Sequence, residues 1–112
     1  MSIEATLSAA VSSLDAQSRR VAVAADNVAN VRTEGYRAAD ATTVSRDPNR
    51  GGGVSVVIRR DTVIADHDAF PSTTDLARET VRLIQAETAY RASLKLVETA
   101  QDLTDSLLDV TG

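Results

Sequence analysis

Few residues of this chain could do chemistry. His67 is the only histidine and lies between Asp66 and Asp68, a pattern that superficially suggests a metal site. Adjacent loop residues point in different directions and no further ligand is near in sequence, so a solvated acidic loop is the favoured interpretation. Cysteine is absent, which excludes disulfides and thiolate metal sites. Residues 51–53, three glycines, lack the Lys and Ser/Thr of a phosphate loop and indicate a flexible turn.

No nucleophile, base or pair of carboxylates has a spacing typical of catalysis, so we expect no enzyme activity, cofactor or metal. The 112 residues are 43% hydrophobic but include one Phe, two Tyr and no Trp, which fits one small domain without a ligand cavity. The net charge of -4 and the absence of a basic stripe argue against nucleic-acid binding. Glu4 stands where a secretory signal needs positive charge, and no apolar run is long enough to span a bilayer. We therefore expect neither a cleaved signal peptide nor membrane insertion.

The first 30 residues have the pattern of an amphipathic helix. Ser2 can cap its start and Glu4 favours the positive end of the helix dipole. Asn30 tolerates the left-handed conformation that closes helices, and Gly35 soon follows. We therefore expect a helix from about residue 3 to about Asn30. Its apolar or small residues alternate at spacings of three and four, with a polar break at Gln17: Ile3, Leu7, Ala10, Leu14, Val21, Ala24, Val28 and Val31.

The middle of the chain differs in kind. Residues 47–53 are dense in turn formers and precede residues 54–58, where Val54, Val56 and Ile58 share one face at strand period. A first strand within 38–45 has strand propensity but weak alternation. The pattern predicts a short β-hairpin or an irregular segment, and a hairpin needs a helix or another subunit to pack on.

The last 40 residues predict a second, longer helix. Residues 71–75, a proline followed by three hydroxyl residues and an acid, mark its start, and it can run to Val110. Its apolar row falls at a spacing of seven residues, with Leu94 and Leu108 on alternate positions and Leu107 widening it: Leu76, Leu83, Tyr90 and Val97. We expect a mainly α fold, in which the two terminal helices pair as an antiparallel coiled-coil-like hairpin around the short middle segment. Residues 1–36, 37–72 and 73–112 together form one domain.

Two paired helices would leave apolar surface uncovered, and this excess predicts self-assembly or docking on a partner. Asp102, Asp105 and Asp109 crowd the C-terminal end of the second helix, where the helix dipole disfavours anions. We expect them to meet basic groups of an adjacent subunit.

The stretch 27–37 is the most informative part of the chain. Asn27 and Asn30 are one helical turn apart, so their amides can bond to backbone at the helix end. Gly35 supplies a positive φ where the chain turns, and Tyr36 places a ring with a polar tip on the outgoing segment. By spacing alone, an ordinary helix terminus followed by a loop is the favoured interpretation.

These residues also carry a resemblance. The pattern Asn-x-Ala-Asn-x-x-Thr-x-Gly-Tyr followed by a basic residue, at 27–37, resembles the N-terminal signature of bacterial flagellar rod and hook proteins. Residues 75–90 are similar to the family's second signature, which continues in register through Lys95, Thr99, Ala100, Leu103 and Leu107. Ser93 stands where the family commonly has Asn, and Thr80 where Met is common. The short middle segment resembles that of proximal-rod members.

The resemblance implies a structural subunit of the flagellar basal-body rod. Family members are exported unfolded by the flagellar type III apparatus without signal cleavage, and their terminal helices then stack into a tube, the torque-transmitting shaft in the periplasm. Partners would be other rod subunits, further copies of the chain and the export apparatus. The alternative is a small helical adaptor or export-chaperone-like protein that binds through its apolar stripe. The residues expected to carry packing and assembly are Leu7, Leu14, Val21, Asn27, Val28, Asn30, Thr33, Gly35, Tyr36, Leu76, Leu83, Tyr90, Leu94, Val97 and Leu107.

Overall fold

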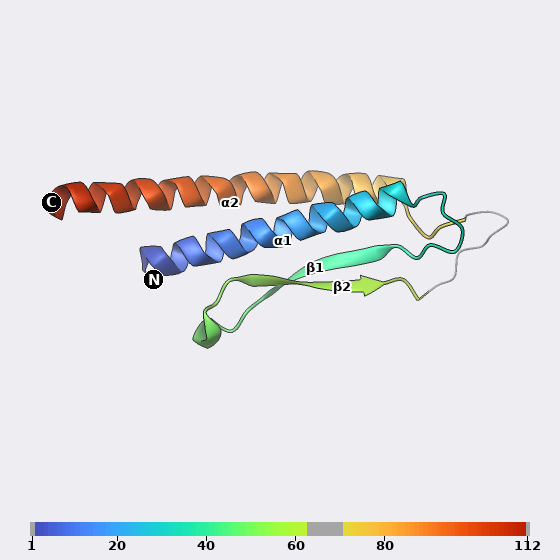
Figure 1. Ribbon diagram of the computed structural model, residues 1–112, viewed down its shortest axis with the longest axis horizontal. Helices are drawn as coiled ribbons and strands as arrows, with labels where there is room; N and C mark the ends of the chain where they lie inside the picture. Colours follow the sequence, from blue (N-terminus) through green and yellow to red (C-terminus); the bar gives the residue numbers. More distant parts are fainter. Residues whose placement is uncertain (1, 63–70, 112) are drawn as a thin grey trace.

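The computed structural model describes residues 2–62 and 71–111 and has the shape of a flat rod measuring 69 × 26 × 14 Å (Figure 1). The acidic triplet Asp66, His67 and Asp68, considered above as a metal site, lies outside the described residues. Two long helices enclose a β-hairpin in sequence, so the predicted mainly α fold is confirmed. In chain order the elements are α1 (Ile3–Ala29), β1 (Ala39–Ser45), a 3-10 turn (Pro48–Arg50), β2 (Val54–Arg60) and α2 (Leu76–Thr111).

Helix α1 begins and ends where its capping residues predict. The Ser2 hydroxyl accepts a hydrogen bond from the backbone N–H of Ala5 at 3.1 Å, which satisfies one of the donors that a helix leaves free in its first turn. At the other end Asn30 has φ -103° and is not left-handed, contrary to the expectation. The left-handed residue is Gly35, with φ +76°. It lies further along because two hydrogen-bonded turns, from Asn30 to Thr33 and from Thr33 to Tyr36, follow the helix.

The predicted hairpin is confirmed, and its strands extend from Ala39 to Ser45 and from Val54 to Arg60. They pair antiparallel, with Ala39 opposite Arg60 and Ser45 opposite Val54. At the tip, the Asp47 carboxylate accepts from the N–H of Asn49 at 2.9 Å, and all three glycines at 51–53 have positive φ. Weak alternation in the first strand did not prevent pairing, because its small residues face a helix instead of a wide core.

Helix α2 starts at a second capped end, where the Asp75 carboxylate accepts from the N–H of Arg78 at 3.2 Å. It runs antiparallel to α1 and extends past the N-terminal end of α1 (Figure 1). In the same view α1 lies between α2 and the hairpin, so α1 is packed on two sides. The hairpin thus obtains the helix support that an isolated pair of strands needs.

The helices meet along small residues and not along the large ones that the heptad pattern emphasised. On α2 the buried residues recur every seven positions, and on α1 the polar Gln17, read above as a break, is buried with its neighbours. Ser13 and Ser93 share a hydrogen bond of 2.7 Å across the contact. Small side chains occupy the contact between the helices because they let the two backbones approach closely. We call the small residues of this set the small-residue seam: Ala10, Ser13 and Ala24 of α1 with Ala86, Ser93 and Ala100 of α2.

A candidate assembly surface and the junction that holds it

Asn27 is the centre of a buried polar junction at the end where α1 finishes. Its side chain has 0% exposure, its Nδ2 donates to the carbonyl of Ala39 at 2.7 Å, and its Oδ1 accepts from the N–H of Ala39 at 2.9 Å. The amide therefore pairs with the first residue of β1 as a neighbouring strand would. The prediction that Asn27 bonds to backbone at its own helix end was wrong, because the hairpin base comes closer than that helix end does.

Asn30 does what the sequence predicted. Its Nδ2 donates to the carbonyl of Asp26 at 2.9 Å, and its Oδ1 accepts from the Thr33 hydroxyl at 3.0 Å. Both bonds satisfy polar groups at the helix end and in the turn that follows it. Asn30 and Thr33 are therefore local capping residues on the surface side of the junction.

Tyr36 closes the junction from outside. Its hydroxyl lies 2.9 Å from Asn27 Oδ1 and 3.2 Å from a carboxylate oxygen of Asp26, and it can donate its one proton to either. The Arg60 guanidinium lies over the ring, 5.7 Å from its centroid, in a cation–π arrangement. Burial raises the pKa of the Tyr36 hydroxyl above its usual value of 10.0 and the Asp26 carboxylate adds to this rise, while Arg60 lowers the pKa.

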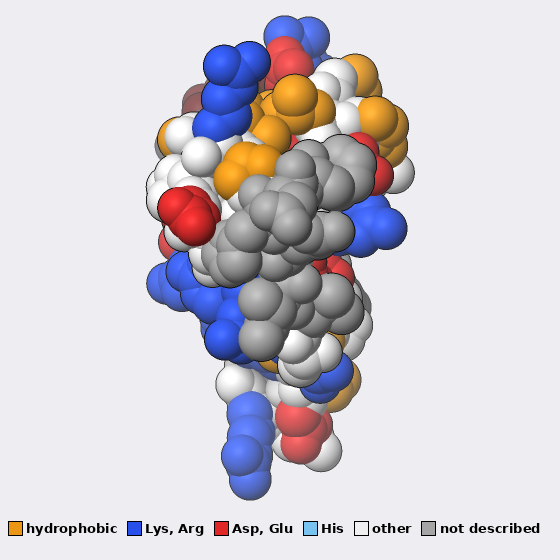
Figure 2. All heavy atoms as spheres, turned by 90° about the vertical axis from the view of Figure 1, so that its right-hand side faces the viewer, with side chains coloured by type: hydrophobic (Ala, Val, Ile, Leu, Met, Phe, Trp, Pro, Cys, Tyr) orange, Lys and Arg blue, Asp and Glu red, His pale blue; other side chains and the backbone are white. Residues whose placement is uncertain are grey.

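The junction joins the two signature regions of the chain. The N–H of Gly35 donates to the carbonyl of Pro71 at 2.9 Å, and the N–H of Thr73 donates to the carbonyl of Tyr36 at 3.1 Å. The Thr74 hydroxyl donates to the carbonyl of Asn27 at 3.0 Å, one of the backbone groups left free at the end of α1. Residues 27–36 and 71–74 therefore hold each other, although some forty residues separate them. Figure 2 views the molecule from this end, where side chains of both charges surround a small apolar area.

A second buried polar group was missed by the sequence analysis. Glu79 is 1% exposed, and its Oε1 accepts from Arg82 at 2.9 Å, while Arg82 also forms an ion pair with Asp40 of β1 at 3.1 Å. Within the described residues the other oxygen of Glu79 has no hydrogen-bond partner. The pair links α2 to the hairpin base. The sequence signal that could have identified Glu79 is its spacing of seven residues from Ala86, which the structure shows to be buried.

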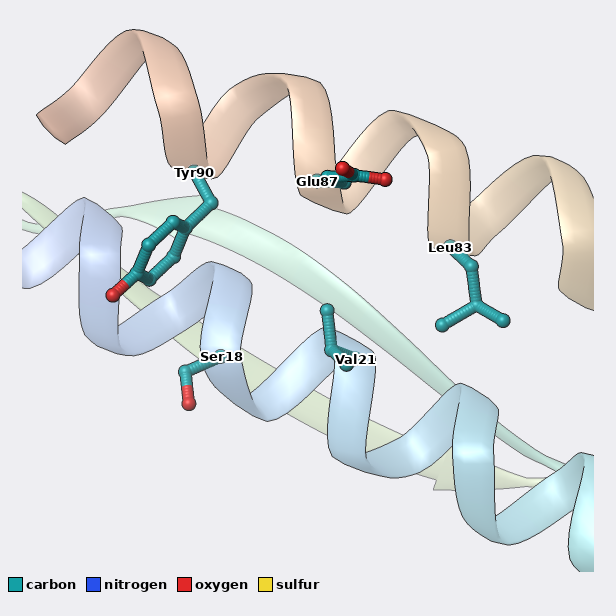
Figure 3. A pocket seen from close by; sticks show the side chains of 5 residues that line it. All are labelled: Ser18, Val21, Leu83, Glu87 and Tyr90. Carbon is teal, nitrogen blue, oxygen red and sulfur yellow. The ribbon is translucent and has the colours of Figure 1, made fainter. Parts of the chain in front are cut away.

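The large heptad residues line an open groove beside the small-residue seam. Val21 of α1 meets Leu83 and Tyr90 of α2 in a groove of about 460 Å³, together with Ser18 and Glu87. Figure 3 shows Leu83 and Tyr90 pointing from α2 toward α1 on either side of Val21. Each helix presents this face again every seven residues, so the groove belongs to two longer rows of apolar side chains. These are Leu7, Leu14, Val21 and Val28 on α1 and Leu76, Leu83, Tyr90 and Val97 on α2. We call these two sets the heptad rows.

The heptad rows are only half covered. Leu7, Leu14, Leu83 and Val97 are of intermediate burial, whereas Val21 and Val28 are 36% exposed. On α2 the exposure is larger: Leu76 50%, Tyr90 40%, Leu94 42% and Leu107 55%. The structure thus brings Val21, Leu83 and Tyr90 together, gathers Asn27, Gly35 and Tyr36 at the junction, and leaves Leu107 at the distal end of α2.

A second apolar groove lies nearer the N-terminal end of α1. It has a volume of about 250 Å³ and is lined by Ile3 and Thr6 of α1 and by four residues of α2, Leu96, Thr99, Ala100 and Leu103. On α2, Leu96 and Leu103 fall on a different face from Leu83 and Tyr90, because their spacing does not continue the same heptad row. Helix α2 therefore presents apolar surface on more than one side, as a helix does when it is surrounded in an assembly.

Residues 2–62 and 71–111 contain no group of three or more His, Cys, Asp or Glu side chains placed to hold a metal ion. Over the same residues, neither helix combines the length and the apolar character needed to cross a lipid bilayer. The features that stand out are grooves and faces suited to contact with other helices.

Comparison with known protein families gives two matches. Residues 7–37 match the model described as "Flagella basal body rod protein", and residues 72–110 match "Flagellar basal body rod FlgEFG protein C-terminal". A comparison with curated proteins found no match. The two matched segments are the ones that the junction ties together, and together they cover more than half of the chain. The chain therefore belongs to the family of flagellar basal body rod proteins, which are structural components of the flagellar rod.

Proposed function

We propose that the chain is a self-assembling subunit of the rod, which polymerises with further copies and with other rod subunits through its terminal helices. The observation that carries this proposal is the open groove between the heptad rows. Val21, Leu83 and Tyr90 converge there from both helices, yet Val21 and Tyr90 stay 36% and 40% exposed. Fully burying one such side chain contributes about 1.5–3 kcal/mol, so several of them together favour the insertion of another helix.

The small-residue seam supports a role in a stiff shaft. Ala86 is 0% exposed and Ala100 5%, although each side chain is a single methyl group, so α2 is closely covered at both positions. Bending the pair would disturb close packing along its whole length, because a dense interior resists deformation. Many such pairs side by side would transmit torque.

Export in an unfolded state by the flagellar type III apparatus, and residence in the periplasmic part of the rod, complete the proposal. The resemblance of residues 27–37 to the N-terminal signature of the family supports both. The chain also lacks cysteine, so no disulfide would have to open before translocation or close after it.

The test is assembly after truncation of one groove side chain. We expect Tyr90→Ala to abolish incorporation into basal bodies when it is expressed in a strain deleted for the native gene, because its ring spans the groove. Gln85→Ala, on an exposed face of the same helix, is the matched control and should support motility and normal basal bodies. Normal incorporation of Tyr90→Ala would contradict the proposal.

The same experiment separates the alternative of an adaptor or export chaperone. A rod subunit co-purifies with basal bodies in several helically arranged copies. An adaptor is recovered instead as a soluble complex of defined stoichiometry and is absent from the purified shaft. Quantitative mass spectrometry of purified basal bodies distinguishes the two.

A further inference from the structure

The β-hairpin has an outer face that α1 does not cover. Cross-strand partners share a face, and the pairs Thr42–Val57 and Val44–Ser55 alternate with pairs that lie against the helix. Val44 and Val57 are 40% and 39% exposed; on the alternate face Ala39 is buried, while Ile58 is 51% exposed near the open end of the strand. Across this outer face the strands expose β-branched side chains.

The hairpin is also the basic part of the molecule. Residues 37–61 contain five Arg and three Asp. Arg46 and Arg50 flank the tip, where Asp47 is the only acid between them. The outer face of the hairpin is thus a β-branched surface with arginines at one end.

The C-terminal part of α2 has the opposite charge. Residues 96–111 contain four acids and no basic residue, and the acids recur at spacings of four, three and four residues: Glu98, Asp102, Asp105 and Asp109. They therefore share one side of the helix. Ala100, midway between Glu98 and Asp102, is 5% exposed and contacts α1, so this acidic side faces away from α1.

The two charged regions lie at nearly the same height along the rod. The N–H of Val54 at the hairpin tip donates to the Ser12 hydroxyl at 3.1 Å, and the next residue, Ser13, bonds to Ser93 of α2. Glu98 follows Ser93 by five residues, or about 7.5 Å along the helix. Within one molecule, however, α1 lies between the hairpin tip and α2, so these two parts of the chain are on opposite sides of α1 (Figure 1).

We propose that the outer face of the hairpin of one copy packs on the outer face of α2 of a second copy, with Arg46 and Arg50 directed toward Asp102 and Asp105. This inference rests on the proposed self-assembly and names the surfaces that carry it. The two faces differ and lie on opposite flanks, so the contact is heterologous and can repeat from copy to copy, as a helical assembly requires. The arginines also offset the unfavourable meeting of carboxylates with the negative end of the α2 dipole.

Cross-linking between two single-cysteine variants tests the contact, because the chain has no cysteine of its own. Val57→Cys lies on the outer face of the hairpin, and Thr88→Cys lies on the exposed side of α2. On oxidation of an equimolar mixture we expect mainly the mixed dimer, and we expect the double variant to form a ladder of oligomers. Predominant Val57→Cys homodimers would indicate a symmetric hairpin contact, and equal yields for all pairs would indicate random collision; either result overturns the proposal.

Charge reversal tests the ionic part of the contact. Arg46→Glu with Arg50→Glu in the Val57→Cys variant should lower the yield of mixed dimer at least fivefold, and Asp102→Arg with Asp105→Arg in the partner should restore it. The wild-type yield should fall with added salt, since exposed charges are screened. Glu4→Arg, an exposed acid on α1, is the matched control and should leave the yield unchanged. Failure of the reversed pair to recover overturns the assigned charge pairing.

The outcomes separate this inference from the proposed function. If basal bodies incorporate the wild-type chain and all charge variants equally, the rod assignment stands and the hairpin contact is overturned. If the chain gives specific mixed cross-links but never enters basal bodies, the hairpin contact stands and the rod function is overturned.

Discussion

The two ends of this molecule satisfy their polar and apolar groups in different ways. At the junction Asn27 is fully buried, and its amide, the Ala39 backbone and the Tyr36 hydroxyl bond to one another. Along the distal third of α2 every residue from 101 to 110 is exposed, including Leu103 at 52% and Val110 at 85%. The junction is complete within one chain, whereas the distal end offers surface that only a neighbour can cover. The proposed assembly uses both, a pre-formed end that sets the geometry and an open end that contacts neighbouring subunits.

Removing the junction amide should have the largest effect. Asn27→Ala leaves the buried N–H and C=O of Ala39 without partners, and at about 1–3 kcal/mol for each unsatisfied group we expect a loss of about 3 kcal/mol in the free energy of unfolding. Urea titration followed by circular dichroism measures it. Asn30→Ala, whose bonds are at the surface, should cost no more than about 1 kcal/mol. Equal costs for the two variants would erase the contrast between the buried junction and its surface.

The small-residue seam, which connects the two ends, should tolerate enlargement poorly. Ala86 is 0% exposed, so Ala86→Leu must push the helices apart, at a cost of about 2 kcal/mol. Ala92→Leu, on an exposed side of α2, should change stability by less than about 0.5 kcal/mol. Thermal unfolding of both variants provides the comparison, and an unchanged Tm for Ala86→Leu would show that the seam is loosely packed.

Gly53 lies close to α1 at the hairpin tip, and replacing it should destabilise the protein for two reasons. Its φ is +82°, and an added Cβ would collide with the Ser12 hydroxyl and lie 3.2 Å from Ser12 Cβ. We expect Gly53→Ala to cost about 1–2 kcal/mol, and Gly51→Ala, with positive φ but open space, to cost about 1 kcal/mol or less. Amide hydrogen exchange of the β2 residues measures the local loss of stability. If Gly51→Ala proves as damaging as Gly53→Ala, the contact with Ser12 contributes nothing.

Tyr36 gives the junction a dependence on alkaline pH. Its folded pKa is raised chiefly by burial, so the neutral hydroxyl is favoured, and the corresponding stability is fully present below the unfolded pKa near 10 and lost as pH rises through the folded value. The wild type should therefore lose more unfolding free energy between pH 9 and 11.5 than Tyr36→Phe does. Parallel pH curves for the two proteins would mean that ionisation of Tyr36 is not coupled to the junction.

The distal end should respond least. Leu103 is 52% exposed, and we expect Leu103→Gln to change the free energy of unfolding of the isolated chain by less than about 0.5 kcal/mol. Amides of residues 101–111 should exchange much faster than those around Asn27, because few tertiary contacts protect them. A large destabilisation by Leu103→Gln, or slow exchange in this segment of the dilute monomer, would remove the distinction between the two ends.

Much of the fold could be read from local signals. Ser2 marks the first turn of α1 and Asp75 that of α2, because short polar side chains satisfy free N–H groups at helix starts. The glycines at 51–53 mark the hairpin tip, because all three adopt positive φ. The family also followed from two short signatures whose residue types and spacing are both restrictive.

The choice of buried face could not be made in the same way. Leu76, Leu83 and Tyr90 repeat every seven residues, and so do Glu79, Ala86 and Ser93, so periodicity alone supports either row as the contact. The larger side chains favoured the row of Leu76, Leu83 and Tyr90, whereas the most buried residues of α2 form the other row. Burial in a close helix pair depends on how near the backbones can approach and not on hydrophobicity alone.

Local order in this protein therefore follows from the linear pattern of caps, turns and heptads, since each acts over a few residues. The partner that each residue meets in a long-range contact does not follow from this pattern. Asn27 has the same residue type as Asn30 three positions later, yet only Asn27 meets the hairpin base, and Glu79 is buried only because Arg82 and the hairpin lie beside it. Such pairings depend on which surfaces come together in space, and one helix cannot encode where its neighbour will lie.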